Sequence, residues 1–270
     1  VCVARLRTCA RARMCTHSPL SVRVCVCIRL LSIEAPASQS ALIFAAGRGE
    51  RMRPLTEHTP KPLLEAGGKR LVEWHLEALA RAGIREVVLN LSHLAAQFPP
   101  ALGDGSRWNL RIRYSEEGPE PLETGGGMLR ALPLLGAAPF IAVNGDIWTD
   151  FDYATLPAEP EGIAHLVMVD NPPQHTAGDF VLRGSRLHDE PAPRLTFAGI
   201  GVYRPELLLD ATPGKFSIVP HLRAAMRAGI VTGAHHRGEW TDVGTPERLA
   251  DLDRKLRRGA PNNGFPLARE

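Results

Sequence analysis

Cysteine is missing from most of this chain, and long apolar runs are missing from all of it. Of the 270 residues only five are cysteine, and all five lie in the first 27 positions. A secreted domain held together by disulfides would carry its cysteines throughout the fold, so residues 28–270 are typical of a cytoplasmic protein. No stretch approaches the roughly eighteen consecutive apolar residues that a transmembrane helix needs. We therefore expect no membrane-spanning helix.

Strong charge of either sign is also lacking. The formal net charge is +3, and residues 1–40 hold six arginines against a single acid. Residues 41–270 carry 26 basic and 28 acidic side chains and are slightly acidic. Domains that bind nucleic acid concentrate basic side chains on one face or along one helix. The composition therefore argues against nucleic acid as a partner, and equally against a membrane.

The first 39 residues differ in composition from everything after them. They are rich in arginine and cysteine, and their most apolar stretch, Val22–Ile33, is interrupted by Arg23 and Arg29. Such interruptions do not suit a secretory signal. We interpret this segment as a disordered leader, or as a stretch upstream of the true start of the protein. A transit peptide and a metal-binding leader built on Cys25–Cys27 are the alternatives.

Residues 40–258 are expected to form one domain, followed by a flexible, turn-rich tail over 259–270. Short apolar runs alternate there with stretches of helical periodicity. This order is typical of an α/β fold, here a single Rossmann-like domain with a mainly parallel sheet and helices on both faces. We expect a smaller mixed sheet over the ligand crevice within 164–204. The expected strands are Ala41–Phe44, Val87–Leu89, Leu110–Tyr114, Phe140–Val143, His165–Val169, Asp179–Leu182 and Leu195–Tyr203, and the expected helices are Leu71–Ala82, His93–Leu102, Gly126–Leu135, Ser217–Ala228 and Thr245–Arg258.

The most informative segment lies between Leu42 and Leu63. Its apolar strand ends in Ala45–Gly49, where small residues let the backbone approach a phosphate and direct N–H groups at it. Lys61 follows with a proline on each side, which lowers the entropy cost of aiming its amine. Lysine is not the usual basic residue of this chain, because residues 41–270 contain four lysines against 22 arginines. The pattern predicts a phosphate-binding loop, although a solvated glycine-rich turn is the alternative. It is not a Walker A loop, because no Gly-Lys-Ser/Thr follows.

Together with Pro60-Lys61-Pro62, this segment resembles the signature of the sugar-phosphate nucleotidyltransferases. The resemblance extends over residues 41–250. Within the family, five further stretches are similar to bacterial uridylyltransferases that act on N-acetylmuramate α-1-phosphate in the recycling of cell-wall peptidoglycan. UTP and a sugar-1-phosphate are therefore the implied partners. The five stretches are Leu102–Arg107, Glu120–Gly127, Val143–Asp150, Val169–Pro172 and Trp240–Thr245.

The resemblance also implies a Mg²⁺ site made of two aspartates. Asp146 follows a buried strand at an expected ligand crevice, where a carboxylate without a partner is costly and a metal ion would remove that cost. Asp242, in the string Trp-Thr-Asp-Val-Gly, is implied as the second ligand. Carboxylates and phosphate oxygens are ligands that suit Mg²⁺. For either aspartate the alternative is a role as a turn or cap residue.

The remaining site residues are assigned by the same resemblance. Arg51 and Lys61 are the expected catalytic residues, because they would hold the phosphates that react. Glu117 and the loop Leu122–Gly127 match the part of the family that recognises the nucleobase. The expected nucleotide-binding residues are Ala45, Ala46, Gly47, Gly49, Glu50, Arg51, Lys61, Glu117, Glu123 and Asn144, and the expected sugar-binding residues are Asn171, Gly178, Asp179 and Gly199.

The chemistry needs no nucleophilic side chain. A phosphate monoester is already largely dianionic near pH 7, since its second pKa is about 6. Attack on the α-phosphorus of UTP then requires neutralised charge and in-line positioning. This agrees with a sequence that offers no nucleophile elbow and no Cys–His arrangement.

Two other functions remain open at this point. One is another sugar-1-phosphate nucleotidyltransferase, which would use glucose or mannose 1-phosphate with dTTP, GTP, CTP or UTP. The other is a non-catalytic sensor of sugar nucleotides, which the loss of Lys61, Arg51 or either aspartate would favour. All four residues are present. Because no β-helix repeat or dimerisation segment follows the last expected helix, we expect a short stand-alone form and a monomer.

Overall fold

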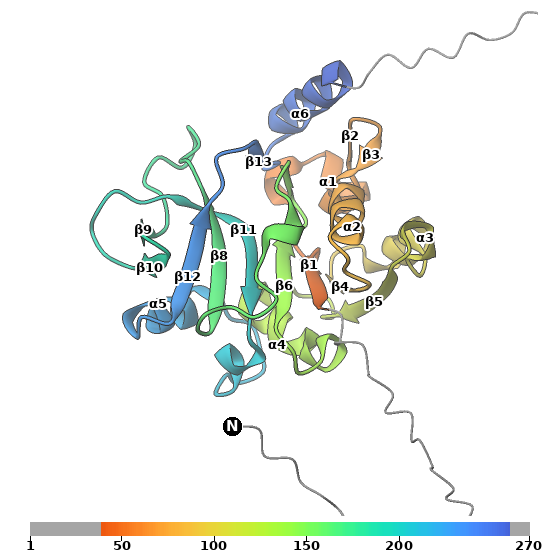
Figure 1. Ribbon diagram of the computed structural model, residues 1–270. Helices are drawn as coiled ribbons and strands as arrows, with labels where there is room; N and C mark the ends of the chain where they lie inside the picture. Colours follow the sequence, from red (N-terminus) through yellow and green to blue (C-terminus); the bar gives the residue numbers. More distant parts are fainter. Residues whose placement is uncertain (1–38, 260–270) are drawn as a thin grey trace, which may run out of the picture. The chain divides into compact units, whose positions relative to one another are not determined.

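In the computed structural model, which describes residues 39–259, the apolar runs of the sequence form one nine-stranded sheet (Figure 1). What we expect of the leader and the tail concerns residues outside this range. In sheet order the strands are β5 (Arg111–Glu116), β4 (Glu86–Leu91), β1 (Ser40–Phe44), β6 (Phe140–Asn144), β11 (Thr196–Tyr203), β8 (Ala164–Val169), β12 (Val231–His235), β10 (Arg186–His188) and β9 (Val181–Arg183).

The strand directions place seven carboxyl ends at one edge of the sheet, because only β11 and β10 run the other way. Strands β5, β4, β1 and β6 are mutually parallel. Strand β11 is antiparallel to β6 on one side and to β8 on the other, and β12 is parallel to β8. Strands β8 and β12 therefore run in the same direction as β1. The structure differs here from the expected separate mixed sheet, because β11 joins the later strands to the first four.

Six α-helices and two small ribbons lie around the sheet within the described range. The ribbons are antiparallel pairs, and one of them joins segments that are far apart in the sequence. None of the helices is long and apolar enough to cross a membrane. The helices are α1 (Leu55–His58), α2 (Leu71–Arg81), α3 (Phe98–Leu102), α4 (Glu123–Leu135), α5 (Val219–Arg227) and α6 (Pro246–Gly259), and the ribbons are β2 (Glu65–Ala66) with β3 (Lys69–Arg70) and β7 (Ile147–Thr149) with β13 (Trp240–Asp242).

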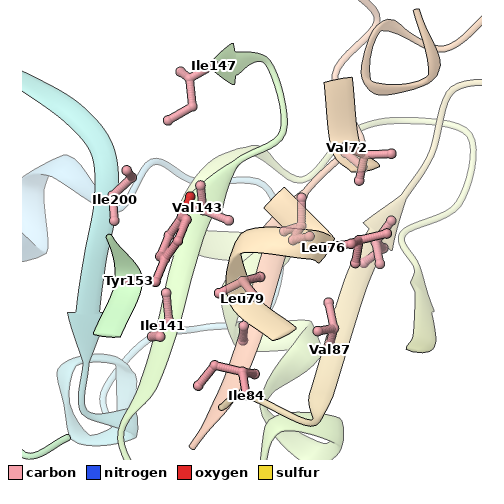
Figure 2. Packing of buried hydrophobic residues seen from close by; sticks show 14 of the residues in the cluster. Val72, Leu76, Leu79, Ile84, Val87, Ile141, Val143, Ile147, Tyr153 and Ile200 are labelled. Carbon is pink, nitrogen blue, oxygen red and sulfur yellow. The ribbon is translucent and has the colours of Figure 1, made fainter. Parts of the chain in front are cut away.

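Both faces of the sheet are buried, because successive side chains of a strand point to opposite faces. On β1, Ile43 belongs to the cluster that includes α2, while Leu42 belongs to the cluster that includes α4 and α5. Figure 2 shows Leu76 and Leu79 of α2 packed over the first of these faces. A third, smaller cluster joins α6 to Trp148 of β7. This packing leaves the carboxyl edge of the strands free to form a site.

Candidate active site

A cavity of about 550 Å³ lies where β1, β4, β5 and β6 end. All ten residues predicted to bind the nucleotide line it, and so does Asp146. The four predicted sugar-binding residues and Asp242 are not among its lining residues, although Gly244, two positions after Asp242, is. The cavity falls within the usual size range for small-molecule sites. The structure thus brings the predicted phosphate-binding and nucleobase-binding segments to one place.

The glycine-rich loop after β1 is folded back on itself. Gly49 has a φ of 62°, and a Cβ added there would lie 2.9 Å from the Cγ2 atom of Thr56, so this position requires glycine. The Thr56 hydroxyl donates to the Gly49 carbonyl at 2.8 Å, and the Met52 amide donates to the same carbonyl. At Gly47 no atom lies within 4 Å of a would-be Cβ. The loop is therefore anchored at Gly49 and open at Gly47, as a ligand would require.

Lys61 is buried and reaches the aspartate that follows β6. Its Nζ lies 2.6 Å from Oδ2 of Asp146, and only 8% of the residue is exposed. The flanking prolines fit their positions, because Lys61–Leu63 forms a short 3-10 turn and Pro60 stands in the extended backbone before it. The Asp146 side chain is 40% exposed, so the pair lies at the cavity wall and not deep in the core.

The two predicted metal ligands are brought together by the β7–β13 ribbon. Asp242 is paired with Ile147 in the register, and the Val243 amide donates to the Asp146 carbonyl at 2.8 Å. The Asp242 carboxylate accepts from Arg248 at 2.5 Å and from Gln174 at 2.6 Å, both at Oδ1. The Thr245 hydroxyl, and not Asp242, accepts from a backbone amide at the start of α6. Two elements hold Asp242 beside the strand end that carries Asp146.

Glu117 lines the cavity, but its carboxylate is already engaged by the protein. Oε1 accepts from the side-chain amide of Asn90 at 2.6 Å, and Oε2 accepts from the Leu122 amide at 2.7 Å. Burial raises the pKa of Glu117, and these two hydrogen bonds oppose that rise. Asn90 in turn accepts from the Ala45 amide at 2.7 Å.

The predicted sugar-binding residues form a separate cluster beside β11. Asn171 accepts from Thr196, and its amide group donates to two backbone carbonyls. Asp179 accepts from the Phe197 amide at 2.8 Å. A Cβ at Gly178 would lie 2.8 Å from the Asn171 side chain, and Gly199 approaches Asn144 closely. These contacts fix the backbone beside the cavity. That the four residues contact the sugar directly stays a prediction.

A buried histidine supports the backbone next to Asp146. His75 Nε2 lies 2.9 Å from the Ile147 carbonyl, and Nδ1 lies 2.9 Å from the Tyr153 hydroxyl. A carbonyl only accepts, so Nε2 carries the proton and the Tyr153 hydroxyl donates to Nδ1. Burial lowers the pKa of His75 from 6.5 to about 4. His75 is therefore neutral at pH 7.

Three residues at the site were not predicted from the sequence. Asn90 interrupts the apolar run of β4 near its carboxyl end, as Asn144 does at the end of β6, so the same signal could have identified both. Gln174 and Arg248 contact Asp242 only through tertiary folding, and no local pattern marks them.

Comparison with known proteins agrees with this geometry. A sequence model described as Nucleotidyl transferase matches residues 40–180. An N-acetylmuramate alpha-1-phosphate uridylyltransferase of Neisseria meningitidis is 49% identical over 220 residues, which cover 78% of this chain and 95% of the relative. A protein with the same name from Caulobacter vibrioides is 34% identical over 237 residues, covering 82% of this chain and 98% of the relative.

A solved structure shares the fold. The inositol-1-phosphate CTP transferase of T. maritima superposes with a TM-score of 0.66, and the match covers 84% of this chain and 99% of that one. Its sequence is only 18% identical, so the likeness supports the arrangement of the sheet and helices and nothing finer.

Proposed function

The chain belongs to the nucleotidyl transferase family, and from that membership we propose that it transfers the uridylyl group of UTP to N-acetylmuramate α-1-phosphate, with release of pyrophosphate. The observation that carries this proposal is the Lys61–Asp146 pair at 2.6 Å, set in a cavity that the glycine-rich loop also lines. The choice of UTP and of this sugar rests on the relative that is 49% identical and is covered over 95% of its length.

In the proposed mechanism the protein positions two phosphates and neutralises their charge. The amides of the loop Ala46–Glu50 and the Arg51 guanidinium would hold the β- and γ-phosphates, which leave as pyrophosphate. Lys61 would contact the phosphates that react, which are the acceptor phosphate and the α-phosphate of UTP. The acceptor phosphate is already dianionic, so no side chain needs to remove a proton. Its oxygen forms a bond to the α-phosphorus of UTP while the bond from that phosphorus to pyrophosphate breaks.

The residues present fit a Mg²⁺ ion. Within residues 39–259 no group of three or more His, Cys, Asp or Glu side chains could hold a metal, so Asp146 and Asp242 would supply two ligands and the substrates and water the rest. Lys61 and Arg248 each engage one oxygen of these carboxylates. A Cβ at Gly244 would lie 3.0 Å from Oδ2 of Asp242, so glycine keeps that second oxygen accessible. When bound, Mg²⁺ would supply positive charge to the reacting phosphates.

The role of Asp146 is tested by Asp146→Asn, which keeps the shape and removes the charge. We expect turnover to fall by about a hundredfold or more, as for other losses of electrostatic stabilisation. The rise in melting temperature that Mg²⁺ and UTP together give the wild type should also shrink. Folding should survive, because the side chain is 40% exposed. Asp150→Asn, at a carboxylate that contacts His236, is the matched control. Normal turnover of Asp146→Asn with Mg²⁺ would contradict the assignment.

The reaction itself is tested by incubating the protein with each nucleoside triphosphate and a panel of sugar-1-phosphates and measuring pyrophosphate. We expect UTP with N-acetylmuramate α-1-phosphate to react fastest. A faster reaction with another pair would make the protein a different sugar-1-phosphate nucleotidyltransferase. Binding without release of pyrophosphate for any pair would indicate the sensor. In keeping with the proposed substrates we place the reaction in the cytoplasm, as part of peptidoglycan recycling, and we expect a monomer.

A further inference from the structure

A continuous chain of hydrogen bonds links the two sides of the cavity. On the phosphate side, the Ala45 amide begins the glycine-rich loop and donates to Oδ1 of Asn90 at 2.7 Å. Asn90 then donates from Nδ2 to Oε1 of Glu117 at 2.6 Å. On the other side, Oε2 of Glu117 accepts from the Leu122 amide at 2.7 Å, just before α4. Two side chains thus connect the ends of β1, β4 and β5 to the start of a helix.

The two side chains of this link are buried, and the Glu117 oxygens and the Asn90 amide group are all hydrogen-bonded within it. Asn90 is 2% exposed and Glu117 is 8% exposed. A Cβ at Gly127 would lie 2.3 Å from Oε1 of Glu117 and 2.7 Å from Nδ2 of Asn90, so this turn of α4 has glycine because the two polar groups press against it. Each Glu117 oxygen already has a protein donor, which leaves the carboxylate poorly placed to bind a nucleobase directly.

We propose that Asn90 and Glu117 are a positioning pair, which fixes the first amide of the phosphate loop relative to the segment that begins α4. The inference rests on the proposed function, and it assigns Glu117 a role through Asn90 and Leu122 instead of a contact with the base. Its consequence is specific. The pair should hold the loop equally well with the carboxylate at position 90 or at position 117, as long as the other position carries an amide.

Either single substitution breaks the pair. In Asn90→Asp two carboxylates face each other at hydrogen-bond distance, and like charges so placed repel. In Glu117→Gln the new amide has one oxygen and one NH₂ for two neighbours that both donate, so one donor is left facing another donor in a buried site. A misplaced loop should weaken UTP binding, and we expect the KM for UTP to rise about tenfold or more in each variant.

The double variant Asn90→Asp/Glu117→Gln exchanges the two groups. The carboxylate at position 90 accepts from the Ala45 amide and from the new amide at position 117, whose oxygen accepts from the Leu122 amide. Every hydrogen bond of the chain is restored, and the net charge is unchanged. We expect the KM for UTP to return to within about threefold of the wild type. A carboxylate that bound the base from position 117 would not be restored by this exchange.

The experiment measures kcat and the KM for UTP and for the sugar phosphate in the wild type, both single variants and the double variant. Glu86→Gln, at the opposite end of the same two strands, removes a partly buried carboxylate that is paired with Arg111 and Arg113, and it is the control. The inference is overturned if the double variant is no better than the worse single variant, or if both single variants keep the KM of the wild type. If a single variant does not fold, the KM for UTP of the double variant decides alone. Gly127→Ala in the otherwise unchanged protein should also raise the KM for UTP, because the added Cβ would displace Glu117.

The outcome is separable from the proposed function. If the wild type prefers another nucleotide, the same series is run with that nucleotide and the inference is unaffected. If the wild type turns over none, the proposed function fails, and a double-mutant cycle in urea unfolding still tests the pair. The double variant should then be more stable than the two single variants predict by addition, and plain additivity would contradict the pairing.

Discussion

At the scale of single residues, Lys61 has an unusual environment for a lysine. Lysines are almost never buried without a partner, and Lys61 is buried against Asp146 at the wall of the cavity. A buried ion pair is weak evidence for stability, because desolvation offsets the attraction. Its place in the cavity lined by the glycine-rich loop supports the role in the reaction that we propose for it.

We predict that Lys61→Met lowers kcat and kcat/KM together by about 30- to 1000-fold, which corresponds to about 2–4 kcal/mol of lost charge stabilisation in the transition state. The fold should survive, because methionine keeps most of the stem packing and the exposed side of Asp146 remains hydrated. Steady-state kinetics and a thermal melt measure both effects. Lys61→Arg should restore little activity, since a planar guanidinium does not replace a compact ammonium. Turnover of Lys61→Met within about twofold of the wild type would remove Lys61 from the mechanism.

His75 predicts how stability depends on pH. Its pKa is about 4 in the folded protein and 6.5 in the unfolded chain, so the unfolded chain binds more protons between these values. The contribution of His75 to the free energy of unfolding is therefore complete above pH 6.5. It is lost as the pH drops towards 4, by up to about 3 kcal/mol. Urea unfolding from pH 4 to 7 measures it. His75→Gln should have a shallower slope over that range, and an equal slope in both proteins would contradict the prediction.

Individual site residues were predictable where chemistry is local. The prolines around Lys61 and the small residues after β1 pointed, in the sequence itself, to segments that the structure places in the cavity wall. Gln174 and Arg248 could not be predicted, because what makes them matter is their contact with Asp242, which lies 68 and 6 positions away. For Glu117 the resemblance supplied a cavity position, and only the structure shows that its two oxygens are engaged.

At the scale of elements, β11 shows how backbone conformation affects the site. Its pairing with β8 shifts register between Phe197 and Gly201, and Gly199, at a φ of 76°, lies within the irregularity. A Cβ at Gly199 would lie 2.5 Å from the side-chain amide of Asn144, a residue that lines the cavity. The shift therefore packs the strand's backbone against the cavity wall.

We predict that Gly199→Ala destabilises the protein by at least about 1–2 kcal/mol through its left-handed backbone and also lowers activity by displacing Asn144. Gly83→Ala is the matched control, because Gly83 also has a positive φ, at 89°, but no atom within 4 Å of the added carbon. The control should lose stability and keep kcat/KM. Equal activity losses in the two variants, measured at a temperature where both are folded, would show that Asn144 is not involved.

Helix α4 shows where prediction of elements fails. The sequence predicted a helix over Gly126–Leu135, and each of the three successive glycines at 125–127 costs roughly 1 kcal/mol in a helix relative to alanine. The helix in fact begins at Glu123 and includes all three. A Cβ on them would collide with Phe216, with the Gly214 carbonyl and with Glu117. Tertiary contacts far along the chain outweigh local propensity here, and the antiparallel insertion of β11 into the sheet depends on the same kind of distant contact.

At the scale of the whole molecule, the three hydrophobic clusters draw on residues between Ala41 and Leu256. We propose that residues 40–258 are the transferase domain and fold by themselves. A chain of residues 39–259 should melt within about 2 °C of the full chain and release pyrophosphate at a rate within about twofold of it. A large fall in melting temperature or rate would show that the removed segments belong to the folded enzyme.

The β7–β13 ribbon has a consequence for the order of events during synthesis. The chain grows by about 5–20 residues per second, so Asp146 emerges from the ribosome roughly 5–20 seconds before Asp242. By then β1, β4, β5 and β6 have all been made, with the glycine-rich loop and Lys61 among them. The nascent chain would nevertheless hold only one of the two carboxylates. If Asp146 and Asp242 both hold Mg²⁺, as we propose, activity begins only once residue 242 has been made, and we expect translation that stops before residue 240 to yield much of the sheet without catalysis.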